Sequence, residues 1–255
     1  MIDEKVVGVY SSVGPLAAAE QAQWYRKVAT EWGINSFELP LLAGQPLAPE
    51  VAEELGSMSS TIVVTMVTQL AIAGQQDAAY GLSATAEVSR GAALLDIQST
   101  VQQCVSLSRT GIVVRAVVVH VGRRSVDPVS HALAFYRSLV ELKATLAAVL
   151  PDTVLSVEIT DNRPDDHPIP FPAAKKAPLE MDQVLQTVAA VNRDTDKGRD
   201  VSMVANLGRF VVNGDDPIKA LEKLLAAEVP FEGVIMSGAG VSKDGFTDSH
   251  NSHLD

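Results

Sequence analysis

Residues 154–162, Val-Leu-Ser-Val-Glu-Ile-Thr-Asp-Asn, form the stretch from which the fold of this chain is best inferred. Its apolar, largely β-branched residues make a run of strand length, and Glu158 lies inside that run. A lone ionised carboxylate in a strand core would cost several kcal/mol, so Glu158 should be paired, metal-bound or placed where the strand opens onto a cleft. Asp161 and Asn162 follow at the carboxyl end of the strand. We therefore expect a functional site at this strand end.

On either side of this stretch, short apolar runs alternate with longer amphipathic segments. Strands are predicted at 6–10, 36–39, 61–67, 113–121, 201–205 and 233–236, in addition to the opening stretch. Helices are predicted at 16–32, 49–56, 84–108, 179–192, and after the two Asp-Pro pairs at 127–128 and 216–217. Residues 68–83 are interpreted as a polar, glycine-containing stretch without helix.

This alternation predicts an α/β fold with a parallel sheet and outer helices. No GxGxxG turn follows the first strand, which favours a (β/α)8 TIM-barrel-like fold over a doubly wound sheet. Only seven strands can be counted, so the eighth unit is expected to be lacking or distorted. We expect one domain over residues 1–255, with a polar irregular tail at 244–255.

Composition narrows the classes of partner and compartment. The formal net charge is −11 and the pI about 4.9, which argues against nucleic acid as a partner. No apolar run approaches the roughly 20 residues of a membrane span. Cys104 is the only cysteine and lies in a helical pattern, so it is interpreted as a core residue rather than a nucleophile. These features predict a cytoplasmic, soluble protein.

Polar residues near the predicted strand ends are the candidate site, because active residues of such barrels lie at the carboxyl ends of the strands. They are Glu38, His120, Arg123, Glu158, Asp161, Asn162, Asn206, Arg209 and Ser237.

Several alternatives stay open for these candidates. His120 is either a core histidine or a ligand or acid/base group. Glu158 could form a structural bridge with an arginine, although site membership is favoured, and Asp161 and Asn162 could be turn residues. The turn 237–240 could bind phosphate through its amides, a weaker indication.

At the same residues the chain resembles the xylose-isomerase-like barrel superfamily, which includes sugar isomerases, epimerases and apurinic-site endonucleases. The resemblance rests on short segments that span nearly the whole chain: Ser-Phe-Glu-Leu-Pro at 36–40, Val-His-Val-Gly at 119–122, Val-Glu-Ile-Thr-Asp at 157–161, Asn-Leu-Gly-Arg at 206–209 and Gly-Val-Ile-Met-Ser-Gly at 233–238. Within the superfamily the chain is most similar to an uncharacterised bacterial family of unknown function, which carries a similar Asn-x-Gly-Arg segment and a terminal Asp-Ser-His, here at 248–250.

The resemblance implies a divalent metal such as Zn, Mn or Mg, held by residues from several strand ends, with His120 and Glu158 at matching positions. The chain departs from that pattern at Asn206, where a ligand Asp or His is expected, and at Ser237. A further Glu from an eighth strand is not evident. A metal-free pocket for a small polar ligand is therefore the alternative.

The leading functional hypothesis is an enzyme that isomerises or epimerises a sugar or related polyol. Glu158 would act as base or ligand, His120 as ligand or proton shuttle, and Arg209 would position a substrate oxygen. The proline-rich segment 163–178 would be the lid. The alternatives are a carbohydrate- or metabolite-binding barrel without catalysis, and metal-dependent cleavage of abasic DNA, which the acidic balance disfavours. Exposed sheet edges at the first and seventh strands predict a homo-oligomer.

Overall fold

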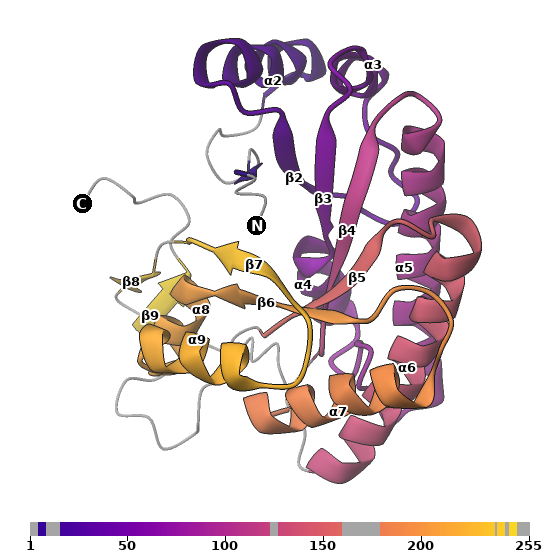
Figure 1. Ribbon diagram of the computed structural model, residues 1–255, viewed down its shortest axis with the longest axis vertical. Helices are drawn as coiled ribbons and strands as arrows, with labels where there is room; N and C mark the ends of the chain where they lie inside the picture. The colour runs from indigo at the N-terminus through magenta and orange to yellow at the C-terminus, as the bar shows by residue number, and fades with distance from the viewer. Residues whose placement is uncertain are drawn as a thin grey trace.

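The computed structural model describes residues 5–8, 16–122, 127–159, 179–237, 239–242 and 245–248. Seven parallel strands form one sheet in the order β1-β2-β3-β4-β5-β6-β7, and the sheet curls into a half-barrel with helices around it (Figure 1). The fold is therefore TIM-barrel-like, as predicted, with a unit missing or distorted. The strands are β1 Val7–Gly8, β2 Ser36–Pro40, β3 Thr61–Thr65, β4 Val113–His120, β5 Val154–Glu158, β6 Ser202–Asn206 and β7 Phe231–Ile235.

Helices follow the strands and cover the outer face of the sheet, with α5, α6 and α7 lying side by side along it (Figure 1). Their bounds are α2 Ala18–Trp32, α3 Pro49–Ser57, α4 Val67–Gln76, α5 Glu87–Ser108, α6 Pro128–Val149, α7 Met181–Asp194, α8 Leu207–Asn213 and α9 Pro217–Ala226. Among the described residues, no helix combines the length and the apolar character that crossing a membrane requires.

The capping residues predicted from the sequence act as expected. The Asp127 side chain accepts a hydrogen bond from the Ser130 backbone N–H at the start of α6. Asp216 likewise caps α9 by accepting hydrogen bonds from two backbone N–H groups. Gly33 ends α2 with φ +67°, a conformation that favours glycine.

Three local predictions were wrong. Residues 68–83 contain most of α4, whose buried face consists only of Leu70 and Gly74, so its Thr and Gln residues resemble a loop in sequence. The short helix α8 was not predicted, although Asn206 before it is a favoured N-cap residue. The predicted irregular tail contains β9, Gly245–Asp248, which pairs with β8, Ala239–Ser242, in an antiparallel hairpin beside α8 (Figure 1).

The two faces of the sheet bury different side chains. Leu155 and Val157 of β5 belong to the large apolar cluster beneath the outer helices, in which Cys104 of α5 is also buried, as predicted. Val154 and Val204 are buried outside that cluster, on the inner face of the sheet. Because side chains alternate along a strand, the inner face also carries the final residues of β4, β5 and β6.

An ion pair across the inner face shows how strongly the sheet curls. Arg115 of β4 donates from Nε to Glu232 Oε1 of β7 over 3.0 Å, although two strands lie between β4 and β7 in the sheet. The two side chains can meet only across the interior of the half-barrel. The same curvature brings the carboxyl ends of β4 to β7 together around a common centre.

Candidate active site

Three polar residues end three adjacent strands on the inner face. His120 is the last residue of β4, Glu158 the last of β5 and Asn206 the last of β6. His120 and Glu158 are direct partners in the ladder register. The exposed fractions are 3% for His120, 3% for Glu158 and 2% for Asn206, so the group is enclosed and its hydrogen bonds must be made within the protein.

Glu158 is the centre of this group. His120 Nε2 lies 2.9 Å from Glu158 Oε2, and Asn206 Nδ2 donates to Glu158 Oε1 over 2.8 Å. Arg209, in the first turn of α8, is 3% exposed and has its Nε 3.8 Å from Glu158 Oε1. Both carboxylate oxygens therefore have polar partners, as the sequence required of a buried glutamate.

Asn206 is held in one orientation. Its Oδ1 accepts hydrogen bonds from the Arg209 backbone N–H at 3.2 Å and from Ser237 Oγ at 2.6 Å. With the oxygen used in this way, the NH₂ group must point to Glu158. A Cβ at Gly208 would come within 2.5 Å of the Ser237 carbonyl oxygen, so only glycine allows β7 and α8 to approach so closely.

The electrostatics of the group favour an ionised Glu158. Burial alone would raise the pKa of Glu158, but the hydrogen-bonded His120, the charge of Arg209 and the hydrogen bond from Asn206 outweigh it and lower the pKa to about 2. An ionised carboxylate can only accept, so His120 Nε2 carries the proton in their hydrogen bond. The other ring nitrogen, Nδ1, has no hydrogen-bond partner among the described residues.

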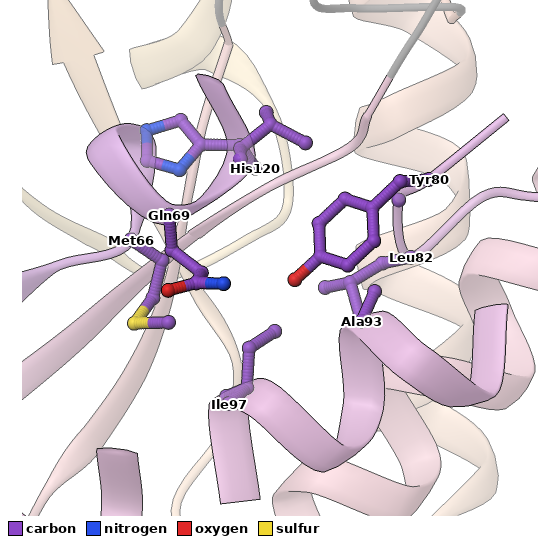
Figure 2. A pocket seen from close by; sticks show the side chains of 9 residues that line it. Met66, Gln69, Tyr80, Leu82, Ala93, Ile97 and His120 are labelled. Atoms are coloured by element: carbon purple, nitrogen blue, oxygen red, sulfur yellow. The ribbon is translucent and has the colours of Figure 1, made fainter. Parts of the chain in front are cut away.

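His120 also lines a small cavity between the sheet and the helices α4 and α5 (Figure 2). The cavity volume is about 20 Å³, which is enough for one water molecule but not for a sugar. Gln69 and Tyr80 contribute polar side chains to its lining, and Met66, Leu82 and Ile97 contribute apolar ones.

Apart from His120, the polar residues of this cavity, Gln69 and Tyr80, were not predicted from the sequence. Gln69 Nε2 and Tyr80 Oη both donate to Asp96 Oδ2 over 2.8 Å, so the two side chains are held by one carboxylate of α5. Gln69 and Tyr80 both lie in residues 68–83, where no helix was predicted. Without a helix there, the sequence did not show which side chains would share a face. Ser156 and Ser202 share a 2.6 Å hydrogen bond on the inner face. Each lies two residues before another inner-face residue, Glu158 or Val204, so strand alternation could have placed both serines on that face.

Of the remaining predicted site residues, the structure describes only Glu38. Glu38 lies in the middle of β2, where the ladder aligns it with Val63 and, one strand further, with Ala116, four residues before His120. Arg123, Asp161 and Asn162 lie outside the described residues, as do the predicted lid 163–178 and Gly238 of the predicted phosphate turn.

A larger hollow of about 480 Å³ lies between the end of β5 and the helices α7, α8 and α9. It is lined by Ile159, Glu180, Asp215, Lys219 and Lys223, among others. Ile159 belongs to the apolar cluster under the outer helices, so this hollow faces away from the Glu158 carboxylate.

The described residues do not fit a divalent metal. They contain no group of three or more His, Cys, Asp or Glu side chains that could hold one, whereas catalytic zinc sites use three protein ligands. Asn206 Oδ1 already accepts two hydrogen bonds, and Arg209 places a positive charge next to Glu158. The ligand set implied by the resemblance is therefore incomplete among these residues.

Solved structures with the same architecture confirm the fold. A xylose isomerase domain protein from Planctomyces limnophilus has a TM-score of 0.58 at 14% identity, with 95% of this chain and 78% of that chain covered. A 3-keto-D-glucoside 4-epimerase from E. coli has a TM-score of 0.53 at 15% identity, covering 91% and 78%. An IOLI protein with a binding zinc atom has a TM-score of 0.57 at 13% identity, covering 86% and 67%. The chain thus shares its TIM-barrel-like fold with these structures, as the sequence resemblance implied.

The family itself follows from the sequence match. The chain belongs to the family described as Domain of unknown function (DUF4862), whose model matches residues 6–254. No curated protein matches the sequence significantly.

Proposed function

We propose that this protein is a sugar or polyol isomerase or epimerase in which His120 moves the proton. The observation that carries the proposal is the 2.9 Å contact between His120 Nε2 and Glu158 Oε2, together with the absence of a partner for Nδ1 among the described residues. A carboxylate that holds one ring nitrogen protonated leaves the other as a base, as in other histidine–carboxylate pairs. The architecture shared with a 3-keto-D-glucoside 4-epimerase supports the class of substrate.

Glu158 has the orienting role in this proposal. Its pKa of about 2 makes it a weak base at neutral pH, whereas efficient general bases have pKa values near the working pH. It fixes the ring of His120 and stabilises the imidazolium that forms when Nδ1 accepts a proton. Arg209, at the edge of the same group, would position a substrate oxygen.

The proposed step is a proton transfer at a carbon next to a carbonyl group. Nδ1 of His120 accepts the proton from that carbon, and the electron pair of the broken C–H bond moves to the carbonyl oxygen to give an enediolate. Return of the proton to the former carbonyl carbon gives the isomer, as the remaining hydroxyl proton passes to the former carbonyl oxygen. Return of a proton to the original carbon from the other face gives the epimer. A single base serves one face of the substrate, so this arrangement favours isomerisation.

Exchange of substrate hydrogen with solvent tests the proposal even when the product is not identified. A panel of aldoses and ketoses is incubated with the protein in D₂O and followed by NMR. We expect deuterium to enter at the carbon next to the carbonyl for at least one compound. Substitutions His120→Gln and Glu158→Gln should slow that exchange by about 10²- to 10⁴-fold, whereas His131→Gln serves as a control histidine outside the group.

Two results would contradict the proposal. Full turnover by the Glu158→Gln variant on an identified substrate would remove the orienting role of that residue. Tight binding of a sugar without any exchange would instead support the alternative of a carbohydrate-binding barrel. That alternative has its own observation in the structure, because every side-chain polar atom of Glu158 and Asn206 is already engaged within the protein.

A further inference from the structure

Among the described residues, the buried charge of Glu158 has a counter-charge beside it. Glu158 brings one negative charge and Arg209 one positive charge, and each residue is 3% exposed. Arg209 Nε lies 3.8 Å from Glu158 Oε1. A buried charge requires a counter-charge nearby, and for Glu158 the guanidinium of α8 already provides one.

The local structure places the backbone of Arg209 close to Glu158. Asn206 caps α8 by accepting the backbone N–H of Arg209, and the same amide donates to Glu158. The backbone of Arg209 and the carboxylate of Glu158 are thus joined through one side chain. The first turn of the helix therefore brings residue 209 next to the carboxylate, and its Nε lies 3.8 Å from Glu158 Oε1.

The carboxylate oxygens of Glu158 and the amide atoms of Asn206 are also engaged in hydrogen bonds. His120 Nε2 bonds to one carboxylate oxygen and Asn206 Nδ2 to the other, while Asn206 Oδ1 accepts two hydrogen bonds. A divalent ion bound by His120 Nε2 and Glu158 would have to separate this pair and would lie next to the positive charge of Arg209. Like charges in a buried site repel strongly because the effective dielectric constant there is lower than that of water.

We propose that Arg209, rather than a bound divalent metal, supplies the fixed positive charge that balances Glu158 in this site. Arg209 is then a positioning residue: it holds the carboxylate that orients His120, and it occupies the electrostatic place that a metal ion would need. The same side chains serve the proposed function, but their charge balance does not depend on which reaction they catalyse.

The first test measures the metal content of the wild-type protein. Untagged protein purified without chelator should contain far less than one Zn, Mn or Mg ion per chain by mass spectrometry of the elements. Its Tm should be the same with EDTA and with each of Zn²⁺, Mn²⁺ and Mg²⁺ added. Near-stoichiometric metal that disappears in the Glu158→Gln variant would overturn the proposal.

The second test removes the positive charge and asks whether a metal can then bind. Isothermal titration with Zn²⁺ alone compares the wild type with Arg209→Gln and Arg209→Lys. We expect Zn²⁺ to bind Arg209→Gln at least about 10-fold more tightly than the wild type, because His120 and Glu158 lose the cation that opposes the ion. Arg209→Lys keeps the charge and should behave as the wild type does.

Two controls separate this effect from a general loss of structure. Arg193→Gln removes an arginine whose side chain is 72% exposed, and it should leave Zn²⁺ binding unchanged. Adding His120→Ala to Arg209→Gln should abolish the gain, because the ion then lacks a ligand. Equal Zn²⁺ affinity in Arg209→Gln and the wild type would overturn the proposal. The wild-type measurement remains decisive even if Arg209→Gln does not fold, and neither test depends on turnover.

Discussion

The substitution Asn206→Asp places a second carboxylate against Glu158. Asp has nearly the same shape as Asn and can still accept the hydrogen bonds from the Arg209 backbone N–H and Ser237 Oγ. What it loses is the donor that now lies 2.8 Å from Glu158 Oε1. The change therefore isolates the interaction between position 206 and the Glu158 carboxylate.

The expected cost follows from that distance. Two ionised carboxylates about 4 Å apart repel each other by about 4 kcal/mol at an effective dielectric constant near 20. If position 206 takes up a proton instead, the pKa of its carboxyl must be raised by several units, at about 1.36 kcal/mol for each. In either case we expect the free energy of unfolding to fall by about 3 to 5 kcal/mol at pH 7. In a protein of this size, such a change lowers Tm by roughly 10 °C.

The loss of stability in Asn206→Asp should depend on pH. The introduced carboxyl has a folded-state pKa above its unfolded value of about 3.9, so it destabilises the fold only above that pH, and increasingly so up to its folded pKa. The loss should be small near pH 4 and largest at neutral pH. Urea unfolding of both proteins across pH 4 to 8, followed by circular dichroism, measures it.

A matched control is available at Asn192. This residue also donates from Nδ2 over 2.8 Å, but to the Val201 carbonyl oxygen rather than to a carboxylate. Asn192→Asp therefore measures the cost of exchanging an amide for an acid without an opposing carboxylate. If Asn206→Asp costs no more than this control, or if its cost does not shrink on acidification, our account of the buried group is refuted.

Three further outcomes are expected. The pKa of Glu158 is lowered to about 2, so its ionised form should stabilise the fold above the unfolded pKa near 4.5. That contribution should be lost as the pH falls from 4.5 towards 2. The difference in unfolding free energy between wild type and Glu158→Gln should therefore shrink over this pH range. Gly208→Ala should lower Tm because its Cβ would clash with Ser237, whereas Gly91→Ala, in open space on α5, should raise stability by up to about 1 kcal/mol in the same thermal scans. The edge strand β7 ends beside Met236, which is 80% exposed, and we expect a homodimer that covers this edge; a monomer in light scattering at high dilution would contradict it.

The main features of the fold were predictable because they rest on periodicity and on helix ends. Asp127 and Asp216, each followed by proline, mark two helix starts that the structure confirms. The apolar strands alternate with helices in the order that a parallel barrel requires. In contrast, α4 and α8 were missed because helices of 10 and 7 residues are too short to show a clear hydrophobic periodicity.

The candidate site was predictable only in part. Glu158, His120, Asn206, Arg209 and Ser237 come together because each lies at or just after a strand end, and the strand order places those ends side by side. Glu38 does not join them, since strand register cannot be derived from a single strand of sequence. The cavity side chains Gln69 and Tyr80 approach His120 through tertiary packing, which leaves no local pattern.

The hydrogen bonds of the group also bear on whether it is only a structural bridge. A bridge that serves stability alone should satisfy each of its buried polar atoms, because every unsatisfied one costs about 1 to 3 kcal/mol. Glu158 and Asn206 meet that condition, but Nδ1 of His120, whose residue is 3% exposed, does not among the described residues. Replacing a buried ion pair with apolar side chains is often neutral or stabilising, so stability alone gives little reason to keep an incomplete one. The one unpaired atom of His120 is also the one that a substrate proton would need, which favours a catalytic role for His120 over a structural one.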